Sequence, residues 1–361
     1  AEADVEFPEE ERMFLEGNKA LAEAAVRAGC RFFAGYPITP STGILEHMSK
    51  RLPEVGGVCM FPGTEVEGIT MVQGAAGAGA RAMTATTSTA YSLMQETMAE
   101  CANAGWPVVV VNICRGSMQG DYYQTVKGGG HGDYRLLVLA PHTAQEMVDL
   151  TYEAFDLAQK YQHPVVIFGD TVLAHTTETV EFRTPEFEER PEFPWPTNGE
   201  PDRPRHSISY LGHTGLSTDI GGAIRSGLER FERIRENETR WEEFAVDGAD
   251  VVVVAFGTAA RYARHAIKEL QEEGAKIGLF RPITLSPFPA EALAAAARGK
   301  KAVACFELNM GAMINDVRSA VFGSAPVHEV RSASKRQAFG AIPSVESLKE
   351  TFAGYLTGET G

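Results

Sequence analysis

Residues 107–113, PVVVVNI, form a short run that is almost wholly apolar. Such a run is typical of a strand that is buried on both faces, as in the middle of a parallel sheet. Strand-like and helix-like segments alternate on both sides of it. The strand-like segments are residues 30–34, 58–61, 81–86, 136–140 and 164–168, and the helix-like ones are 18–28, 43–50, 64–79, 91–103 and 144–160. This alternation predicts an α/β fold with a mostly parallel, doubly wound sheet.

A change in composition follows this first unit. Residues 184–206 are rich in proline and glutamate, which is typical of an extended connector, and an Arg/Glu-rich helix is expected at 221–239. A second alternating unit has expected strands at 250–256, 276–280 and 301–307, helices at 259–273, 290–298 and 312–321, and a loop at 281–289. We therefore expect an α/β domain over residues 1–185, a connector with a helix over 186–245, and a second α/β domain over 246–361.

The charge balance limits the partners of this chain. Its 361 residues include 33 Lys and Arg against 48 Asp and Glu, a formal net charge of −15. An acidic balance argues against binding to a phosphate backbone, so we expect no nucleic acid. No apolar run approaches the ~20 residues of a membrane span. The N-terminal residues lack the basic and apolar parts of a signal peptide, so we expect no membrane association and a cytoplasmic location.

The cysteines are isolated from one another, and no two form a C-x-x-C pair. This spacing argues against a disulfide framework, a zinc site or an iron–sulfur site, and favours reduced thiols. Histidines and carboxylates also show no metal-ligand spacing, so no metal site is expected on this chain. The five cysteines are Cys30, Cys59, Cys101, Cys114 and Cys305.

Three loops with unusual content follow predicted strands, where ligands bind in α/β sheets. The first contains Thr39, whose hydroxyl suits a small anion, although a threonine between prolines can simply fix a turn. The second contains Glu65 at the start of a helix, where a carboxylate also complements the helix dipole. The third contains Arg115, whose planar guanidinium matches a carboxylate, although a surface ion pair is the alternative.

Familiar short motifs are absent or weak. The chain contains no G-x-x-x-x-G-K-[ST] and no G-x-S-x-G, and GAAGAG at 74–79 is not the dinucleotide motif G-x-G-x-x-G. Residues 127–135, KGGGHGDYR, allow close backbone approach to a ligand or partner because of three consecutive glycines. His131 in this stretch is either an acid–base group or a loop histidine.

Several of these stretches together resemble the α subunit of 2-oxoacid:ferredoxin oxidoreductases. They occur in the same order as in that family and cover nearly the whole chain. The stretch KGGGHGDY is most similar to the branched-chain, 2-oxoisovalerate branch. The stretches are GYPITPST at 35–42, GAAGAGARAM at 74–83, SLMQE at 92–96, KGGGHGDY at 127–134, QEMVDLTYEAF at 145–155 and RPITL at 281–285.

The resemblance implies a thiamine diphosphate enzyme that is divided among subunits. This chain would carry the domain for the aminopyrimidine ring, followed by a domain like the C-terminal domain of transketolase. A β subunit would supply the diphosphate site, Mg²⁺ and a [4Fe-4S] cluster, so this chain should be inactive alone. The family also implies γ and ferredoxin-like δ subunits, ferredoxin as electron acceptor and coenzyme A as cosubstrate. The absence of a G-D-G sequence followed by paired asparagines agrees with this division.

The resemblance also implies roles for individual residues. The Glu65 carboxylate would hydrogen-bond N1′ of the cofactor and take part in catalysis, with Glu67 as the nearby alternative. Arg115 and Thr39 would bind the substrate carboxylate. The other expected contacts are to substrate from Tyr36, Tyr123, Gln124 and His131, and to cofactor from Pro37, Ile38, Thr89 and Ser92.

Two segments depart from the family pattern. Residues 117–124 are shorter than the usual Gly/Pro-rich stretch, and TSTA at 87–90 replaces a Ser-Pro-Gly-like turn. Both departures leave the 2-oxoacid open among branched-chain, 2-oxoglutarate, pyruvate, aryl and oxalate-like acids. The sequence as a whole also leaves the direction of the reaction open. They also motivate one alternative, a non-catalytic interaction subunit. A nicotinamide-dependent dehydrogenase ranks last because its glycine motif is missing.

Overall fold

The computed structural model describes residues 7–8, 10–116, 118–183, 220–330 and 342–358. Its larger sheet has seven strands in the order β12-β6-β7-β5-β4-β2-β3, all parallel except β12, which is antiparallel to β6. The strands are β2 (Phe32–Ala34), β3 (Val58–Met60), β4 (Ala82–Thr86), β5 (Val108–Cys114), β6 (Leu137–Leu139), β7 (Val165–Asp170) and β12 (Thr284–Ser286).

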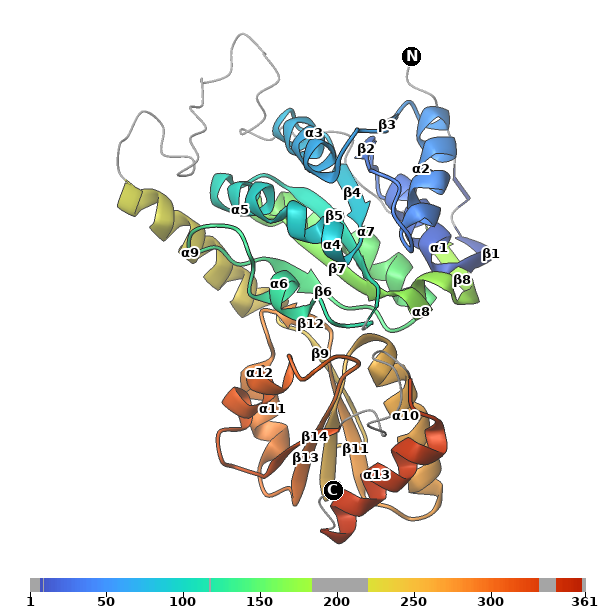
Figure 1. Cartoon of the computed structure of the whole chain (residues 1–361), viewed down its shortest axis with the longest axis vertical. Helices are drawn as coiled ribbons and strands as arrows, with labels where there is room; N and C mark the ends of the chain where they lie inside the picture. Colours follow the sequence, from blue (N-terminus) through green and yellow to red (C-terminus); the bar gives the residue numbers. More distant parts are fainter. Residues whose placement is uncertain (1–6, 9, 117, 184–219, 331–341, 359–361) are drawn as a thin grey trace.

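The central strand β5 is buried along its whole length, as the sequence predicts. Val109 and Val111 belong to a core under α1, α2 and α7, whereas Val108 and Val110 belong to a second core under α3 and α5. Successive side chains of a strand point to opposite faces, so helices cover both faces of the sheet (Figure 1). The helices of this half are α1 (Gly17–Arg27), α2 (Thr42–Glu54), α3 (Glu65–Gly77), α4 (Ser88–Leu93), α5 (Gln95–Ala104), α6 (Tyr122–Val126), α7 (Ala144–Tyr161) and α8 (Thr171–His175).

Three features of this half differ from the expectation. The helix expected at 91–103 is divided into α4 and α5. The division falls at Met94, whose N–H bonds to the carbonyl of Tyr91 three residues earlier and so makes a tighter turn than an α-helix. The second half of the segment 117–124 belongs to the short helix α6. A two-stranded antiparallel sheet of β1 (Glu10–Glu16) and β8 (Thr177–Arg183) was not expected, since its outward positions are mostly charged.

The second half contains a five-stranded sheet in the order β14-β13-β10-β11-β9. The strands predicted at 250–256, 276–280 and 301–307 are present as β10, β11 and β13. The edge strands and the last helix were not predicted. The elements are β9 (Trp241–Phe244), β10 (Val251–Val254), β11 (Ile277–Pro282), β13 (Ala302–Phe306) and β14 (Val327–Val330), with α10 (Gly257–Glu272), α11 (Ala290–Ala297), α12 (Ile314–Val321) and α13 (Val345–Thr357).

Helix α9 (Ile220–Glu238) leads into this second half and packs against α5 of the first (Figure 1). The buried Arg230 guanidinium donates a 2.7 Å hydrogen bond to the Ala102 carbonyl at the end of α5. This helix agrees with the one expected at 221–239. The proline-rich connector expected at 184–206 lies outside the described residues.

The two halves are joined by more than the chain connection. Residues 284–286, expected as part of a loop, form β12 and complete the larger sheet beside β6. Arg281 is almost fully buried and pairs with Glu146 of α7 and Glu242 of β9. One apolar core contains side chains from both halves. The second domain therefore has a defined position against the first.

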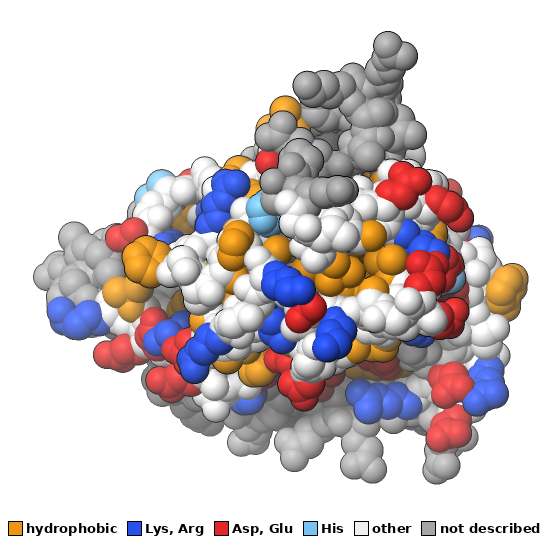
Figure 2. All heavy atoms as spheres, turned by 90° about the horizontal axis from the view of Figure 1, so that it is seen from below, with side chains coloured by type: hydrophobic (Ala, Val, Ile, Leu, Met, Phe, Trp, Pro, Cys, Tyr) orange, Lys and Arg blue, Asp and Glu red, His pale blue; other side chains and the backbone are white. Residues whose placement is uncertain are grey.

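The far end of the second domain carries acidic and basic side chains mixed with apolar ones (Figure 2). Within the described part of the chain, no helix is long and apolar enough to cross a membrane. In the same ranges, no group of three His, Cys, Asp or Glu side chains could hold a metal ion. All five cysteines are free thiols.

Candidate active site

Three loops meet at the carboxyl edge of the larger sheet because β5, β4 and β2 are neighbours and parallel. Thr39 follows β2, Thr89 follows β4 and Arg115 follows β5. The Arg115 guanidinium donates 3.1 Å from Nη1 to the Thr39 carbonyl and 3.2 Å from Nη2 to the Thr89 hydroxyl. All three residues are exposed at this edge. The fold thus brings together three residues that the sequence predicted separately.

Arg115 is placed to receive an anion. It has no ion pair in the structure, apart from any contact with the undescribed residues, and its hydrogen bonds go to neutral oxygens. A guanidinium held in this way can still form a bidentate pair with a carboxylate. The Thr39 hydroxyl lies on the loop that Arg115 contacts, and the peptide bond from Thr39 to Pro40 is cis.

Glu65 and Glu67 differ in what their carboxylates do. Glu67 accepts a 2.7 Å hydrogen bond from the Gly63 N–H, and its own N–H donates to the Thr64 hydroxyl at 3.2 Å. This reciprocal arrangement is a helix N-cap, which gives Glu67 a structural role. The half-buried Glu65 carboxylate forms no hydrogen bond or ion pair with any residue that the structure describes. Glu65 is therefore the carboxylate available for a ligand.

Large apolar side chains are exposed on the segments next to Glu65. Met60 ends β3, Phe61 follows that strand, Val66 follows Glu65 on α3, and Tyr36 follows the neighbouring strand β2. Phe61 is 62% exposed. Pro37 and Ile38 continue the Tyr36 loop and are exposed and partly buried, respectively. A free carboxylate beside apolar side chains suits a flat heterocycle whose ring nitrogen carries a proton, so the residues present fit an aminopyrimidine ring.

A layer of buried polar side chains lies behind Arg115. The Asp121 carboxylate accepts hydrogen bonds from the Ser88 hydroxyl at 2.7 Å, from Gln124 at 2.8 Å and from Asn112 at 3.4 Å. The Arg115 N–H donates to the Ser88 hydroxyl at 3.0 Å. Sequence reasoning missed Ser88, Asn112 and Asp121. A signal existed for Asn112, because it is the one polar residue in the run PVVVVNI.

Gln124 and Ser92 belong to the edge of this polar layer. The Ser92 hydroxyl donates to the Gln124 side-chain oxygen at 2.6 Å, and the Gln124 amide donates to the Ser88 carbonyl at 3.3 Å. Their side chains are already engaged with each other. Burial and the charge of Asp121 raise the pKa of the nearby Cys114 thiol well above its usual range, so this cysteine stays a neutral thiol.

Tyr123 and His131 have partners elsewhere. The half-exposed Tyr123 hydroxyl accepts a 2.5 Å hydrogen bond from the Asn315 amide on α12. The His131 ring lies against the Glu96 carboxylate of α5, and the His131 backbone N–H donates to the same carboxylate at 3.2 Å. Tyr123 thus connects α6 to the second domain, and His131 holds the glycine-rich segment on α5.

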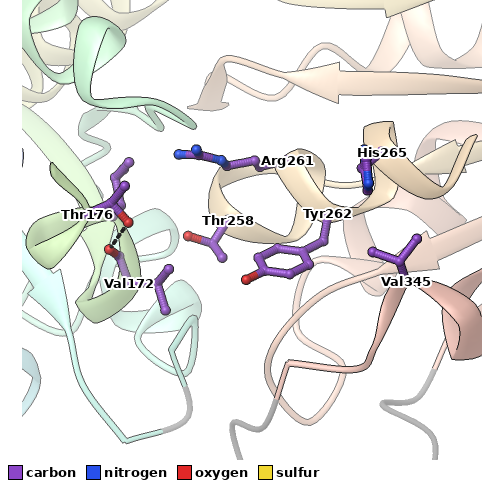
Figure 3. Close-up of a pocket in the computed structure, with 8 residues that line it drawn as sticks. Val172, Thr176, Thr258, Arg261, Tyr262, His265 and Val345 are labelled. Atoms are coloured by element: carbon purple, nitrogen blue, oxygen red, sulfur yellow. Dashed lines mark hydrogen bonds between the residues drawn. The ribbon is translucent and has the colours of Figure 1, made fainter. Parts of the chain in front are cut away.

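A separate cavity of about 260 Å³ lies between α8 and α10, with Val345 of α13 at one end (Figure 3). Thr258 on its wall donates a 2.8 Å hydrogen bond to the buried Asp170 carboxylate. Arg261 pairs with Glu178. None of the site residues predicted from the sequence lines this cavity.

Two family models and a relative of known name match this chain. Residues 23–223 match the family described as pyruvate flavodoxin/ferredoxin oxidoreductase, thiamine diphosphate-binding, and residues 249–338 match pyruvate:ferredoxin oxidoreductase core domain II. The ketoisovalerate oxidoreductase subunit VorB of Methanothermobacter thermautotrophicus is 41% identical over 85% of this chain and 89% of that protein.

Two solved structures share the fold. The 2-oxoglutarate:ferredoxin oxidoreductase of Magnetococcus marinus, solved with 2-oxoglutarate, coenzyme A and succinyl-CoA bound, has a TM-score of 0.84 and 24% identity, over 96% of this chain. This chain spans 65% of the length of that one. An inactive tetramer of a split-gene transketolase has a TM-score of 0.57 and 16% identity, over 96% of this chain and 99% of the other.

The fold and these matches identify a subunit of a thiamine diphosphate-dependent oxidoreductase, and this subunit has an α/β fold. The chain belongs to the 2-oxoacid:ferredoxin oxidoreductase family, as a subunit of the multi-subunit enzyme that carries its thiamine diphosphate-binding domain. The predicted fold class is confirmed, since a doubly wound thiamine diphosphate-type domain is followed by a second α/β domain and transketolase shares the architecture.

Proposed function

We propose that this chain binds the aminopyrimidine ring of thiamine diphosphate through Glu65 and the carboxylate of a 2-oxoacid through Arg115. The observation that carries this proposal is the contact of Arg115 with Thr39 and Thr89, on a sheet edge that also presents Glu65, whose carboxylate has no partner among the described residues. The overall reaction is the oxidative decarboxylation of a 2-oxoacid to acyl-CoA and CO₂, or the reverse carboxylation, with ferredoxin as the electron carrier. Thiamine diphosphate, when bound, stabilises the carbanion that decarboxylation produces.

Each residue has a part that follows from its chemistry. Glu65 holds a proton shared with the ring nitrogen, and this hydrogen bond is strong because a partner subunit covering the site would exclude water. Arg115 orients the substrate carboxylate and neutralises its charge. The Thr39 hydroxyl donates to a substrate oxygen. Tyr36, Pro37 and Ile38 form the wall against the ring, and Thr89 holds the guanidinium in place.

The chain needs a partner because half of the site is missing from it. The apolar side chains around Glu65 are exposed to solvent in the single chain, whereas a heterocycle bound there requires a second wall. We assign the diphosphate site, Mg²⁺ and a [4Fe-4S] cluster to a β subunit. γ and ferredoxin-like δ subunits complete the complex in the cytoplasm, and this chain has no activity alone.

The substrate we propose is 2-oxoisovalerate, following the name of the 41% identical relative. The second candidate is 2-oxoglutarate, which is bound in the structure from Magnetococcus marinus. The reconstituted complex is assayed with coenzyme A and a viologen dye against 2-oxoisovalerate, 2-oxoglutarate, pyruvate, an aryl 2-oxoacid and an oxalate-like acid. We expect the largest kcat/KM for 2-oxoisovalerate. No reduction with any of the five acids would refute the proposed function.

A further inference from the structure

We propose that Asp121 is a positioning residue for substrate binding, acting on Arg115 through Ser88. Asp121 touches neither the substrate site nor the guanidinium in any contact that the structure shows. It orders the turn between β4 and α4, and that turn holds Arg115 at two points. This inference rests on the proposed function, since it assigns Asp121 a role in binding the 2-oxoacid carboxylate.

Ser88 is held in an unusual backbone conformation. Its φ angle is +29°, in the left-handed region that residues with a Cβ seldom adopt unless their surroundings hold them there. Three side-chain hydrogen bonds do so. Asn112 accepts from the Ser88 N–H at 3.2 Å, Asp121 accepts from the Ser88 hydroxyl, and the Ser88 carbonyl accepts from the Gln124 amide at 3.3 Å.

This turn fixes Arg115 at both ends of the residue. The Ser88 hydroxyl accepts from the Arg115 N–H at 3.0 Å, which sets the backbone where the side chain begins. Thr89 follows Ser88 directly, and its hydroxyl accepts from Arg115 Nη2 at 3.2 Å. A change in the conformation of Ser88 therefore moves the backbone partner and the guanidinium partner of Arg115 together.

The site of Asp121 requires a carboxylate. Its two oxygens accept from three donors, the Ser88 O–H, the Gln124 amide and the Asn112 amide, so each oxygen faces one amide N–H. An asparagine would turn its NH₂ group against one of those donors, leaving two buried donors face to face. Asp121 is 9% exposed, so water does not readily replace the lost acceptor.

The second domain determines where Asp121 lies. Asp121 directly precedes α6, where the fully buried Tyr122 donates a 2.8 Å hydrogen bond from its hydroxyl to Asp316 of α12. Gln119 donates at 2.9 Å to the Phe256 carbonyl and accepts at 2.8 Å from the Leu308 N–H. The position of Arg115 is thus connected through α6 to the second domain.

The test uses the assembled complex with Asp121→Asn, and with Ser88→Ala as a smaller change to the same contact. We expect Asp121→Asn to raise the KM for the 2-oxoacid about tenfold, with kcat changed less than about threefold and the KM for coenzyme A unchanged. Ser88→Ala should also raise the KM for the 2-oxoacid. The Kd for a 2-hydroxy acid with the same side chain, measured by isothermal titration, should rise in parallel without any turnover.

A double-mutant cycle separates positioning from a general structural effect. In an Arg115→Ala background, Asp121→Asn should leave KM and Kd unchanged, because no guanidinium remains to be positioned. The matched control is Asp156→Asn, an exposed aspartate on α7 paired with Arg81, which should match wild type. An Asp121→Asn complex with KM within twofold of wild type, or an equal loss in the Arg115→Ala background, would overturn this inference. A wild-type complex inactive on every 2-oxoacid would instead refute the proposed function.

Discussion

The Arg281 guanidinium donates two hydrogen bonds to the Glu146 carboxylate, at 2.7 and 3.0 Å, and so joins β11 of the second domain to α7 of the first. Its Nε donates a further 2.8 Å bond to Glu242. Arg281 lies in the stretch RPITL, at the start of the loop expected over residues 281–289, whereas the structure places it in β11. It connects the second domain to the first, three residues before β12.

Arg281→Met is expected to destabilise the protein by about 3 kcal/mol, because Glu146 loses its arginine partner and Glu242 loses one of its two arginine partners. Thermal unfolding of the assembled complex, followed by scanning calorimetry, measures the change. Arg235→Met, which removes an exposed ion pair with Glu232, should change the stability far less. Equal changes for the two variants would contradict the assignment of Arg281 to the domain interface.

Glu146 should make stability depend on pH in the acid range. Burial acts to raise its pKa, but the hydrogen bond with His142 and the charge of Arg281 outweigh burial and lower the pKa to about 2. A carboxyl group with a lowered folded pKa stabilises the protein above its unfolded pKa of about 4.3, and this contribution is lost as the pH falls toward 2. Glu146→Gln should therefore flatten the decline in melting temperature between pH 5 and pH 3. An unchanged slope would contradict this prediction.

The two glutamates at the start of α3 form a matched pair for mutagenesis. Glu65→Gln should reduce the kcat of the reconstituted complex by about 10²-fold or more, because a neutral amide cannot share a proton with the ring nitrogen as a carboxylate does. Glu67→Gln should retain most of the activity and lower stability by about 1 kcal/mol through the weakened N-cap. Assembly of both variants is checked by size-exclusion chromatography. The reverse pattern would assign the catalytic role to Glu67.

Arg115→Lys keeps the positive charge but removes the planar pair of donors. We expect the KM for the 2-oxoacid to rise about tenfold or more, since a bidentate charge-assisted contact becomes a single one. The KM for coenzyme A provides the internal control and should not change. A lysine variant with wild-type KM would show that the substrate carboxylate binds elsewhere.

The cysteines should differ in reactivity toward alkylating agents. Burial raises the pKa of the Cys59 thiol to about 11 and that of Cys30 to about 12, and only Cys59 is partly exposed. Iodoacetamide at pH 8 should therefore modify the native chain slowly, and at Cys59 first, because the thiolate is the reactive form. Peptide mass spectrometry after timed labelling measures the order. Early modification of Cys114 would contradict the burial of the polar layer behind Arg115.

Much of the candidate site could be predicted from the sequence because parallel strands place their carboxyl ends at one edge. Once β2, β4 and β5 were expected as strands, Thr39, Thr89 and Arg115 had to follow them there. The sequence favours Glu65, with Glu67 as the nearby alternative, since both lie in the first turn of one helix. The N-cap that engages Glu67 is visible only in the structure.

Contacts between distant segments could not be predicted in this way. The sequence of β12 predicts part of a proline-containing loop. The pairing of this strand with β6 depends on the second domain lying against the first. The segment 117–124 differs from the family pattern and was expected to bear on the substrate. Within it, Tyr122 and Tyr123 contact α12 of the second domain, and Gln124 binds Ser92 and Asp121, contacts that the local sequence does not indicate.

The sequence by itself determined the alternation of helices and strands, the buried strand β5 and the family, because hydrophobic periodicity and local motifs act over a few residues. Only the tertiary structure decided which polar side chains meet. Asn112, Asp121 and Ser88 belong to three separate segments, and nothing in their local sequence requires them to bond. They meet because burial removes water from the space behind Arg115, so each buried donor there must find a protein acceptor.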